Sequence, residues 1–328
     1  MTAPPTTAAA DRAVFALWRA AALLRHPRLH WKYVRRMRRL PDVAVPVLFS
    51  ERMLWRKLFD RNPDFVTFSD KLACKRWIAE RAPDLAIPRV LWEGERAEDI
   101  PPALIRPGVA IKANHGSGFN RLIRDAPPPP REQVVATARR WLARDWGRHR
   151  GEWCYAAVPR RVFVEELVTP APDETLFDLK VHAGGGEMGF CGLFTDTKTP
   201  RQRSRRYHAD GTPMAETVPG YAALPDDQPL PPGFHRAVAI ARRLSREVDY
   251  ARFDFLVHGE HVFAGEITVF TAAGYRDFSA ALAPVMTKLW DLRRAWPLRA
   301  DAARDGWLAR AYRPAAIRAV AAQRMHVP

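Results

Sequence analysis

The sequence contains little lysine, little cysteine and no long apolar run. Only eight of its 52 basic residues are lysines, so a lysine inside a strand-like segment is notable in a chain that otherwise uses arginine. The three cysteines lie far apart and form no CxxC pair, which argues against a zinc site and against a disulfide framework. No segment is apolar enough to span a bilayer, and the N-terminus lacks a secretion signal. We therefore expect a cytoplasmic protein, with the inner face of the membrane as a further option.

Several well-known motifs are also absent. The chain has no GxxxxGK[ST] phosphate loop and no GxSxG nucleophile elbow. Its short apolar strands carry no DxD-type motif of the kind expected in a glycosyltransferase that binds a nucleotide sugar. These absences argue against P-loop enzymes, hydrolases of the GxSxG type and such glycosyltransferases.

The overall composition is that of a globular protein with a strongly basic surface. A length of 328 residues fits two closely packed domains, or one large domain with extensions. The net charge of +16 suggests an anionic partner, such as nucleic acid, anionic lipid or an acidic polymer. Because the arginines are spread through the chain and no nucleic-acid-binding motif appears, we expect no specific nucleic-acid partner.

Residues 11–40 form a basic segment with helical spacing, which Pro27 should divide into two helices. The second half, HWKYVRRMRRL, carries Trp31, Tyr33 and Met37 as apolar anchors among basic residues. Such a helix can make a peripheral contact with an anionic membrane face. The alternative, which we prefer, is a helix that packs on the protein body and leaves its basic face in solvent.

A lysine followed by a glycine loop occurs in GVAIKANHGSGFN, residues 108–120. Lys112 lies in an apolar, strand-like run, and a buried ammonium group is costly unless an anion compensates it. The loop that follows contains Gly116, Ser117 and Gly118, whose backbone N–H groups could close over phosphates. A polyphosphate ligand would explain both features, whereas a solvated lysine on an edge strand would explain only the first.

A second lysine, Lys180, lies in the similar run LFDLKVHA. Between the two lysines, the strand-like segment VFVEELV carries Glu165 and Glu166, which point to opposite faces of a strand. The carboxylate that faces a core needs a donor, and an adenine amino group would serve. A salt bridge to one of the many arginines is the alternative.

The segment ARFDFLVHGEHVFAGEITVF predicts a hairpin with polar residues at alternate positions. Arg252 and Asp254 share one face of the first strand, and Glu266 and Thr268 share one face of the second. If these faces coincide, Asp254 and Glu266 form a pair of hard oxygen ligands suited to Mg²⁺ bound together with phosphates. The alternative is an ordinary solvent-facing side of an antiparallel hairpin.

The order of these motifs is more specific than any one of them. It resembles the ATP-grasp superfamily and, more closely, the TupA-like ATP-grasp family associated with teichuronopeptide biosynthesis. The resemblance spans about residues 49–275, in the stretches SERMLWRKLFDRNPDFVTFSDKLACKRWI, VAIKANHGSGFN, RRVFVEELV, FDLKVHAGGG, ARFDFLV and VFAGEITVF. It implies an α+β ATP-grasp fold with two α+β subdomains that clasp ATP, an N-terminal helical extension and C-terminal helices.

The mixed strands and hairpins already favour α+β layering over a doubly wound parallel sheet. We expect a flexible tail and basic helical extension at 1–45 and an N-terminal helical or α+β region at 46–110. The ATP-grasp nucleotide-binding core is expected at 111–290, and a C-terminal helical tail at 291–328.

The resemblance implies ATP and Mg²⁺ as cofactors and assigns roles to residues of this chain. The catalytic residues would be Arg252, Lys180 and Lys112. The nucleotide would be bound by Lys112, Gly116, Ser117, Gly118, Glu165, Glu166, Val168 and Lys180. The metal would be held by Asp254, Glu266 and Thr268, although many ATP-grasp enzymes have an asparagine where this chain has Thr268.

The implied reaction is an ATP-dependent ligation of a carboxylate and an amine, or a similar nucleophile, through an acyl phosphate. Such a reaction needs positioning and charge neutralisation but no protein nucleophile. The family association suggests cell-surface polysaccharide biosynthesis, with an acidic small molecule or polysaccharide as substrate.

Substrate contacts are harder to place in the sequence. Arg201, Arg203 and Arg205 in the predicted loop TKTPRQRSRRYHADGT could clamp acidic groups, together with Lys71, which borders the cleft with Asp70 and Lys75. A solvated loop is the alternative. Two other functions stay open: a basic protein that binds nucleic acid or polysaccharide, and a glycosyltransferase-like assembly protein without ligase turnover.

Overall fold

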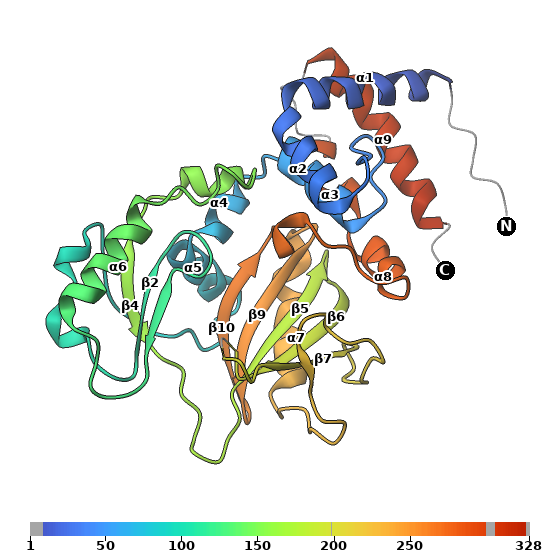
Figure 1. The fold of residues 1–328 in the computed structure, drawn as a ribbon. Coiled ribbons are helices and arrows are strands. Elements are labelled where there is room, and N and C mark those ends of the chain that lie inside the picture. The colour runs from blue at the N-terminus through green and yellow to red at the C-terminus, as the bar shows by residue number, and fades with distance from the viewer. Residues whose placement is uncertain (1–8, 198, 300–305, 326–328) are drawn as a thin grey trace.

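The computed structural model describes residues 9–197, 199–299 and 306–325. These residues form two sheets that are largely antiparallel, with helices around them (Figure 1). The predicted α+β class is therefore confirmed. Residues 1–8 of the predicted N-terminal tail lie outside the described residues, and the four predicted domain boundaries stay predictions.

The smaller sheet has four antiparallel strands in the order β1-β4-β2-β3. Their bounds are β1 (Val90–Gly94), β2 (Val109–Ala113), β3 (Asn120–Ile123) and β4 (Val162–Glu166). Helix α6 (Arg131–Ala143) packs on one face, where its Val134 and Ala138 share a buried cluster with Ile111 and Val164. Lys112 thus lies on a central strand, which excludes the edge-strand explanation.

The larger sheet has six strands in the order β10-β9-β5-β6-β7-β8. Their bounds are β5 (Phe177–Gly184), β6 (Glu187–Thr195), β7 (Arg203–Tyr207), β8 (Ala222–Ala223), β9 (Ala251–His258) and β10 (His261–Thr268). Only the last pairing along this order, β7 with β8, is parallel. Helix α7 (Phe234–Leu244) packs against β5 and β9, and its Phe234 is buried in one core with Leu179 and Phe253. The opposite face of these strands carries the charged residues described below.

Two short helices, α4 (Asp64–Ser69) and α5 (Lys71–Arg81), lie between the two sheets (Figure 1). Asp70 caps α5 by accepting a bond of 2.9 Å from the backbone of Leu72. The cap fixes where α5 begins and therefore where Lys71 points. The helix also contacts β10, so it connects the smaller sheet region to the larger sheet.

The remaining helices form a separate layer at one end of the molecule (Figure 1). They are α1 (Ala9–Arg25), α2 (Pro27–Met37), α3 (Phe49–Phe59), α8 (Leu282–Leu289) and α9 (Trp307–Met325). The buried Arg56 of α3 donates 2.7 Å bonds to both carboxylate oxygens of Asp249, just before β9. This paired charge attaches the helical layer to the larger sheet. The predicted N-terminal and C-terminal helices, and the division near Pro27, are confirmed.

One prediction of local structure is wrong. The basic segment after residue 197 is not wholly a loop, because Arg203–Tyr207 forms strand β7 beside β6. Its residues are polar on both faces, so hydrophobic alternation could not predict a strand. The neighbouring strand supplies the backbone partners that order it, and Ser204 and Arg206 become buried.

Candidate active site

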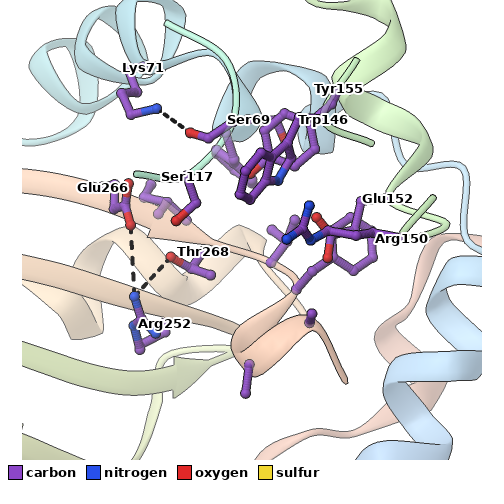
Figure 2. A pocket seen from close by; sticks show the side chains of 17 residues that line it. Ser69, Lys71, Ser117, Trp146, Arg150, Glu152, Tyr155, Arg252, Glu266 and Thr268 are labelled. Carbon is purple, nitrogen blue, oxygen red and sulfur yellow. Dashed lines mark hydrogen bonds and ion pairs between the residues drawn. The ribbon is translucent and has the colours of Figure 1, made fainter. Parts of the chain in front are cut away.

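A pocket of about 320 Å³ lies where β10, the loop after β2 and helices α4 and α5 meet (Figure 2). Its lining residues are Phe68, Ser69, Lys71, Gly116, Ser117, Trp146, Arg150, Glu152, Tyr155, Arg252, Glu266, Ile267, Thr268, Val269, Phe270, Ala272 and Ala273. Figure 2 shows two ends, one with Lys71, Ser117 and Glu266, the other with Arg150 and Glu152. We call these the β10 end and the Arg150 end.

A bulge in β10 brings Glu266 to the face of the sheet that carries Asp254. Gly265 and Glu266 together oppose Asp254 in the ladder between β9 and β10. In an unbroken ladder Glu266 would stand opposite Phe253 and point to the apolar face. The bulge turns Glu266 and Thr268 to the face of Asp254. A Cβ on Gly265 would lie 2.5 Å from the Asp254 carbonyl oxygen, so the bulge requires glycine. The polar faces of β9 and β10 coincide as expected, but they do so because of a β-bulge that simple alternation does not predict.

Arg252 connects the predicted metal ligands. It donates bonds of 2.6 Å and 2.5 Å to the two oxygens of Asp254 and a 3.2 Å bond to the Thr268 hydroxyl. Its Nη2 lies 3.8 Å from Glu266 Oε1. The side chains of Arg252 and Asp254 are only 17% and 8% exposed, which excludes a simple solvent-facing hairpin at these positions. Burial favours the neutral form of Asp254, but Arg252 and Lys180 outweigh it and lower its pKa.

Lys180 extends this charged cluster onto β5. It stands opposite Asp254 in the ladder, and its Nζ lies 3.5 Å from Asp254 and 2.5 Å from Asp178. Burial alone would lower the pKa of Lys180, but Asp254 and Asp178 raise it above the ordinary lysine value. Burial raises the pKa of Asp178, against the opposing effect of Lys180. Asp178 was not among the predicted site residues. Its position two residues before Lys180 could have indicated it, because residues i and i+2 of a strand share a face.

On the smaller sheet, Glu165 holds two lysines. It is 3% exposed, it pairs closely with Lys112, and it lies 2.9 Å from Lys75 of α5. Burial favours the neutral form of Glu165, but the two lysines outweigh it and lower its pKa. Its partners are thus lysines, where we expected an adenine amino group or an arginine. Glu166 points the other way and pairs with Arg89 at the surface. The expected opposite faces of the two glutamates are confirmed.

The glycine loop closes over the β10 end. Lys71 donates a 2.5 Å bond to the Gly116 carbonyl oxygen, which fixes the loop to the start of α5. Gly116 and Gly118 have φ of 74° and 77°, a region that favours glycine. Burial lowers the pKa of Lys71 to about 8, while Glu266 opposes this shift and Lys112 adds to it. The charges of Lys71, Glu266 of the larger sheet and Lys112 of the smaller sheet therefore influence one another at the β10 end of the pocket.

The Arg150 end was not predicted, because its residues lie in an irregular segment without a motif. The Arg150 guanidinium lies 3.8 Å over the Trp146 ring. Within the described part of the chain, it has no recorded hydrogen bond or ion pair to a carboxylate. Glu152 is 4% exposed, burial raises its pKa, and its nearest ion pair is to Lys57 at 3.8 Å. This end therefore offers an oriented cation and a buried carboxylate.

The three predicted substrate arginines do not line this pocket. Arg201 and Arg203 are exposed, and Arg205 pairs with Asp226 at 2.9 Å. Arg206, the last residue of the predicted clamp RQRSRR, stands opposite Gly192, which in turn stands opposite Lys180, so the side chains of Arg206 and Lys180 share one face of the sheet. Among the predicted nucleotide contacts, Gly116 and Ser117 line the pocket. The others lie outside the lining, as does the predicted metal ligand Asp254; they are Lys112, Gly118, Glu165, Glu166, Lys180 and the half-buried Val168 in the connection from β4 to β5.

The residues fit a nucleotide and a metal ion, provided that the phosphates supply part of the metal's ligands. The β10 end combines lysine and arginine side chains with a glycine loop, which suits a polyphosphate. Within residues 9–197, 199–299 and 306–325, no group of three or more His, Cys, Asp or Glu side chains could hold a metal ion alone. Mg²⁺ commonly binds one or two carboxylates together with substrate phosphates, so Asp254 and Glu266 fit a jointly held ion.

Comparisons with known proteins give the following matches. Solved structures similar to the chain include the ATP-grasp ligase PsnB with its minimal precursor, at 15% identity, 69% coverage of this chain, 62% of that chain and a TM-score of 0.35. The D-alanine–D-alanine ligase from Bacillus anthracis complexed with ATP matches at 14% identity, 78% and 68% coverage, and a TM-score of 0.36. The VanG D-Ala:D-Ser ligase from Enterococcus faecalis matches at 13% identity, 67% and 57% coverage, and a TM-score of 0.36.

The chain thus spans about three fifths of the length of PsnB and of the VanG ligase. A comparison with curated proteins finds no match. The model of the TupA-like ATP-grasp family matches residues 51–282, which is more than half of the chain, and this protein therefore belongs to that family.

Proposed function

We propose that this protein is an ATP- and Mg²⁺-dependent ligase that joins a carboxylate to an amine or a similar nucleophile through an acyl phosphate. The observation that carries the proposal is the convergence at one pocket of Lys71 and the glycine loop from one side and Arg252, Glu266 and Thr268 from the other. Cations and a phosphate-binding loop facing hard oxygen ligands suit MgATP.

In this proposal the chain's own residues position and neutralise charge. Lys112 and Lys180 bind phosphate oxygens, and Gly116 and Ser117 of the loop cover them. Mg²⁺, held by Asp254 and Glu266, would reduce the negative charge of the phosphates. Arg252, already anchored at 2.5 Å to Asp254, would stabilise negative charge that develops during transfer.

The reaction balances without a protein nucleophile. A substrate carboxylate oxygen attacks the γ-phosphorus, the bond to the β-phosphate oxygen breaks, and ADP leaves. The amine then attacks the acyl carbon, and inorganic phosphate leaves as the amide bond forms. The amine also loses a proton, which Glu152 at the Arg150 end could accept, since burial raises its pKa.

The Arg150 end supports an acidic substrate. Among the described residues Arg150 has no recorded ion pair, and its planar donor group is of the kind that binds carboxylates with two parallel bonds. A uronic acid or an acidic polysaccharide end would supply such a group, which agrees with the proposed role in cell-surface polysaccharide biosynthesis at the cytoplasmic side. In this proposal Arg150 replaces the arginines 201, 203 and 205 as the substrate contact.

The test is a thermal-shift experiment followed by turnover. MgATP should raise the melting temperature of the wild-type protein, and Lys112→Ala and Glu266→Ala should abolish this rise. Glu80→Ala, at a surface position with a 72% exposed side chain, is the matched control and should keep it. Unchanged shifts in both site variants would contradict the proposed site.

For turnover, ADP release is followed while uronic acids and amino acids are supplied singly and in pairs. A ligase should release phosphate only when a carboxylate substrate is present. Tight, salt-sensitive binding to DNA without nucleotide turnover would instead favour the nucleic-acid-binding alternative.

A further inference from the structure

Helix α1 turns an apolar stripe to solvent. Its buried Phe15 and Ala22 face the protein body, where α1 packs on α9 (Figure 1). The exposed side repeats at three- and four-residue spacing through Ala13, Ala16, Leu17, Ala20, Leu23 and Leu24. Leu17, Leu23 and Leu24 are 50%, 52% and 82% exposed. A surface helix normally carries polar residues on this side, so the exposed stripe is a candidate contact surface.

Helix α2 follows α1 directly in the chain, contacts it, and adds exposed cations. Arg28, Trp31 and Arg35 follow one another at helical spacing, and Trp31 is 64% exposed. The Arg35 guanidinium lies 5.4 Å from the centre of the Trp31 ring. We call Leu17, Leu23, Leu24, Arg28, Trp31 and Arg35 the docking face. We expected this helix to pack on the protein body, and its buried side, with Tyr33, does so.

The charge around the docking face has one sign. Residues 12–41 contain nine lysines and arginines and no aspartate or glutamate. Arg19 and Arg39 are paired with Asp42 and Asp277. In the portion of the chain with assigned structure, no recorded ion pair joins Arg28 or Arg35 to a carboxylate. An anionic partner would therefore gain their attraction without breaking internal pairs.

We propose that the docking face binds the surface of a membrane that contains anionic lipids. Leucine and tryptophan side chains enter the boundary between headgroups and acyl chains, while neighbouring arginines bind lipid phosphates. The contact is peripheral, since no helix in the described ranges is both long and apolar enough to cross a bilayer.

Two other partners fit the docking face less well. A nucleic acid would explain the arginines but gains little from exposed leucines along α1. A second copy of the chain would cover the leucines, but a symmetric contact would bring two strongly basic segments together. Only an anionic lipid surface matches both the apolar stripe and the charge.

The test is co-sedimentation of the full chain, without nucleotide, with lipid vesicles. The protein should sediment with vesicles of equal parts phosphatidylcholine and phosphatidylglycerol, but not with phosphatidylcholine alone, and added salt should weaken binding. Leu24→Asn with Trp31→Asn, and separately Arg28→Gln with Arg35→Gln, should each weaken binding more than tenfold. Tyr221→Asn, at a 41% exposed aromatic residue elsewhere, is the control and should bind normally.

The outcomes separate this proposal from the proposed ligase. All variants should keep the MgATP-dependent melting shift, because their side chains lie outside the pocket. Absence of vesicle binding, or binding that the Leu24 and Trp31 changes leave intact, would overturn the proposal. Light scattering that shows a dimer abolished by those changes would assign the face to a second copy, and DNA binding lost only in the arginine variant would assign it to nucleic acid.

Discussion

Glu165 should be required for stability in the absence of nucleotide, because it neutralises two lysines. Its side chain is 4% exposed, and its carboxylate faces Lys112 and Lys75, whose side chains are 26% and 11% exposed. Glu165→Gln keeps the shape but leaves two ammonium groups without a counter-charge. Removing one partner of a buried ion pair typically costs about 3–5 kcal/mol, and because Lys112 is partly exposed we expect a loss of about 3 kcal/mol.

The pH dependence of this effect has a definite sign. The two lysines outweigh burial and hold the folded-state pKa of Glu165 below the ordinary glutamate value. Its contribution to stability is therefore present at neutral pH and is lost as the pH falls through the folded-state pKa. Urea unfolding of Glu165→Gln and the wild type should differ most at neutral pH and converge in acid.

Bound nucleotide should compensate for the lost carboxylate. If phosphates bind Lys112, they bring negative charge to the group that Glu165→Gln leaves unpaired. MgATP should then raise the melting temperature of this variant more than that of the wild type. Glu166→Gln is the matched control, since Glu166 and its partner Arg89 have side chains 44% and 71% exposed. A surface pair of this kind contributes little to stability.

Two results would refute this reasoning. If Glu165→Gln and Glu166→Gln lose similar amounts of stability, the buried lysines do not depend on Glu165. If MgATP raises the melting temperature of the wild type and of both variants equally, the phosphates do not reach the lysine that Glu165 neutralises.

Three further changes test the bulge, a buried carboxyl and the Arg150 end. Gly265→Ala should lower the free energy of unfolding by about 1–3 kcal/mol and weaken MgATP binding, because the new Cβ would lie 2.5 Å from the Asp254 carbonyl oxygen. Gly306→Ala is the control, since a Cβ there meets open space and should change neither quantity. Calorimetry measures both the stability and the binding. Burial, with a neighbouring carboxylate, raises the pKa of Asp60 to about 7, so stability falls as pH rises from the ordinary aspartate range to about 7. Asp60→Asn should remove that fall in urea unfolding at pH 5 and pH 8, and an unchanged profile would contradict it. Arg150→Met should raise KM for the acidic substrate at least tenfold and leave the MgATP melting shift intact, while the exposed Arg148→Met should change neither.

The sequence predicted the strands and their charged faces well, because period-two alternation is a local property. Lys180 and Asp254 lie in different strands, and their pairing followed from the expectation that polar faces meet around one ligand. The bulge at Gly265 was not predicted. Alternation within one strand cannot specify its register against the neighbouring strand. Here the register depends on the close approach of Gly265 to the Asp254 carbonyl oxygen.

Other parts of the site could not be predicted from local patterns. The contact of Lys75 with Glu165 joins a helix to a strand far along the chain, and no spacing rule connects them. Arg150 lies in an irregular segment, and its orientation follows from stacking on Trp146 rather than from a motif. The prediction that Arg201 lies in a substrate clamp relied on charge density alone, which specifies no direction.

The site is neutralised internally before any ligand binds, and this has a consequence for specificity. Each predicted phosphate-binding lysine already faces a carboxylate, and the carboxylates of Asp254 and Glu266 face Arg252 or lie near it. Phosphates alone would compete with these carboxylates, and a metal ion alone would compete with the arginine. ATP and Mg²⁺ arriving together exchange both sets of pairs at once, because the phosphates take the cations and the metal takes the carboxylates. The arrangement therefore favours cooperative binding of nucleotide and metal over tight binding of either one alone.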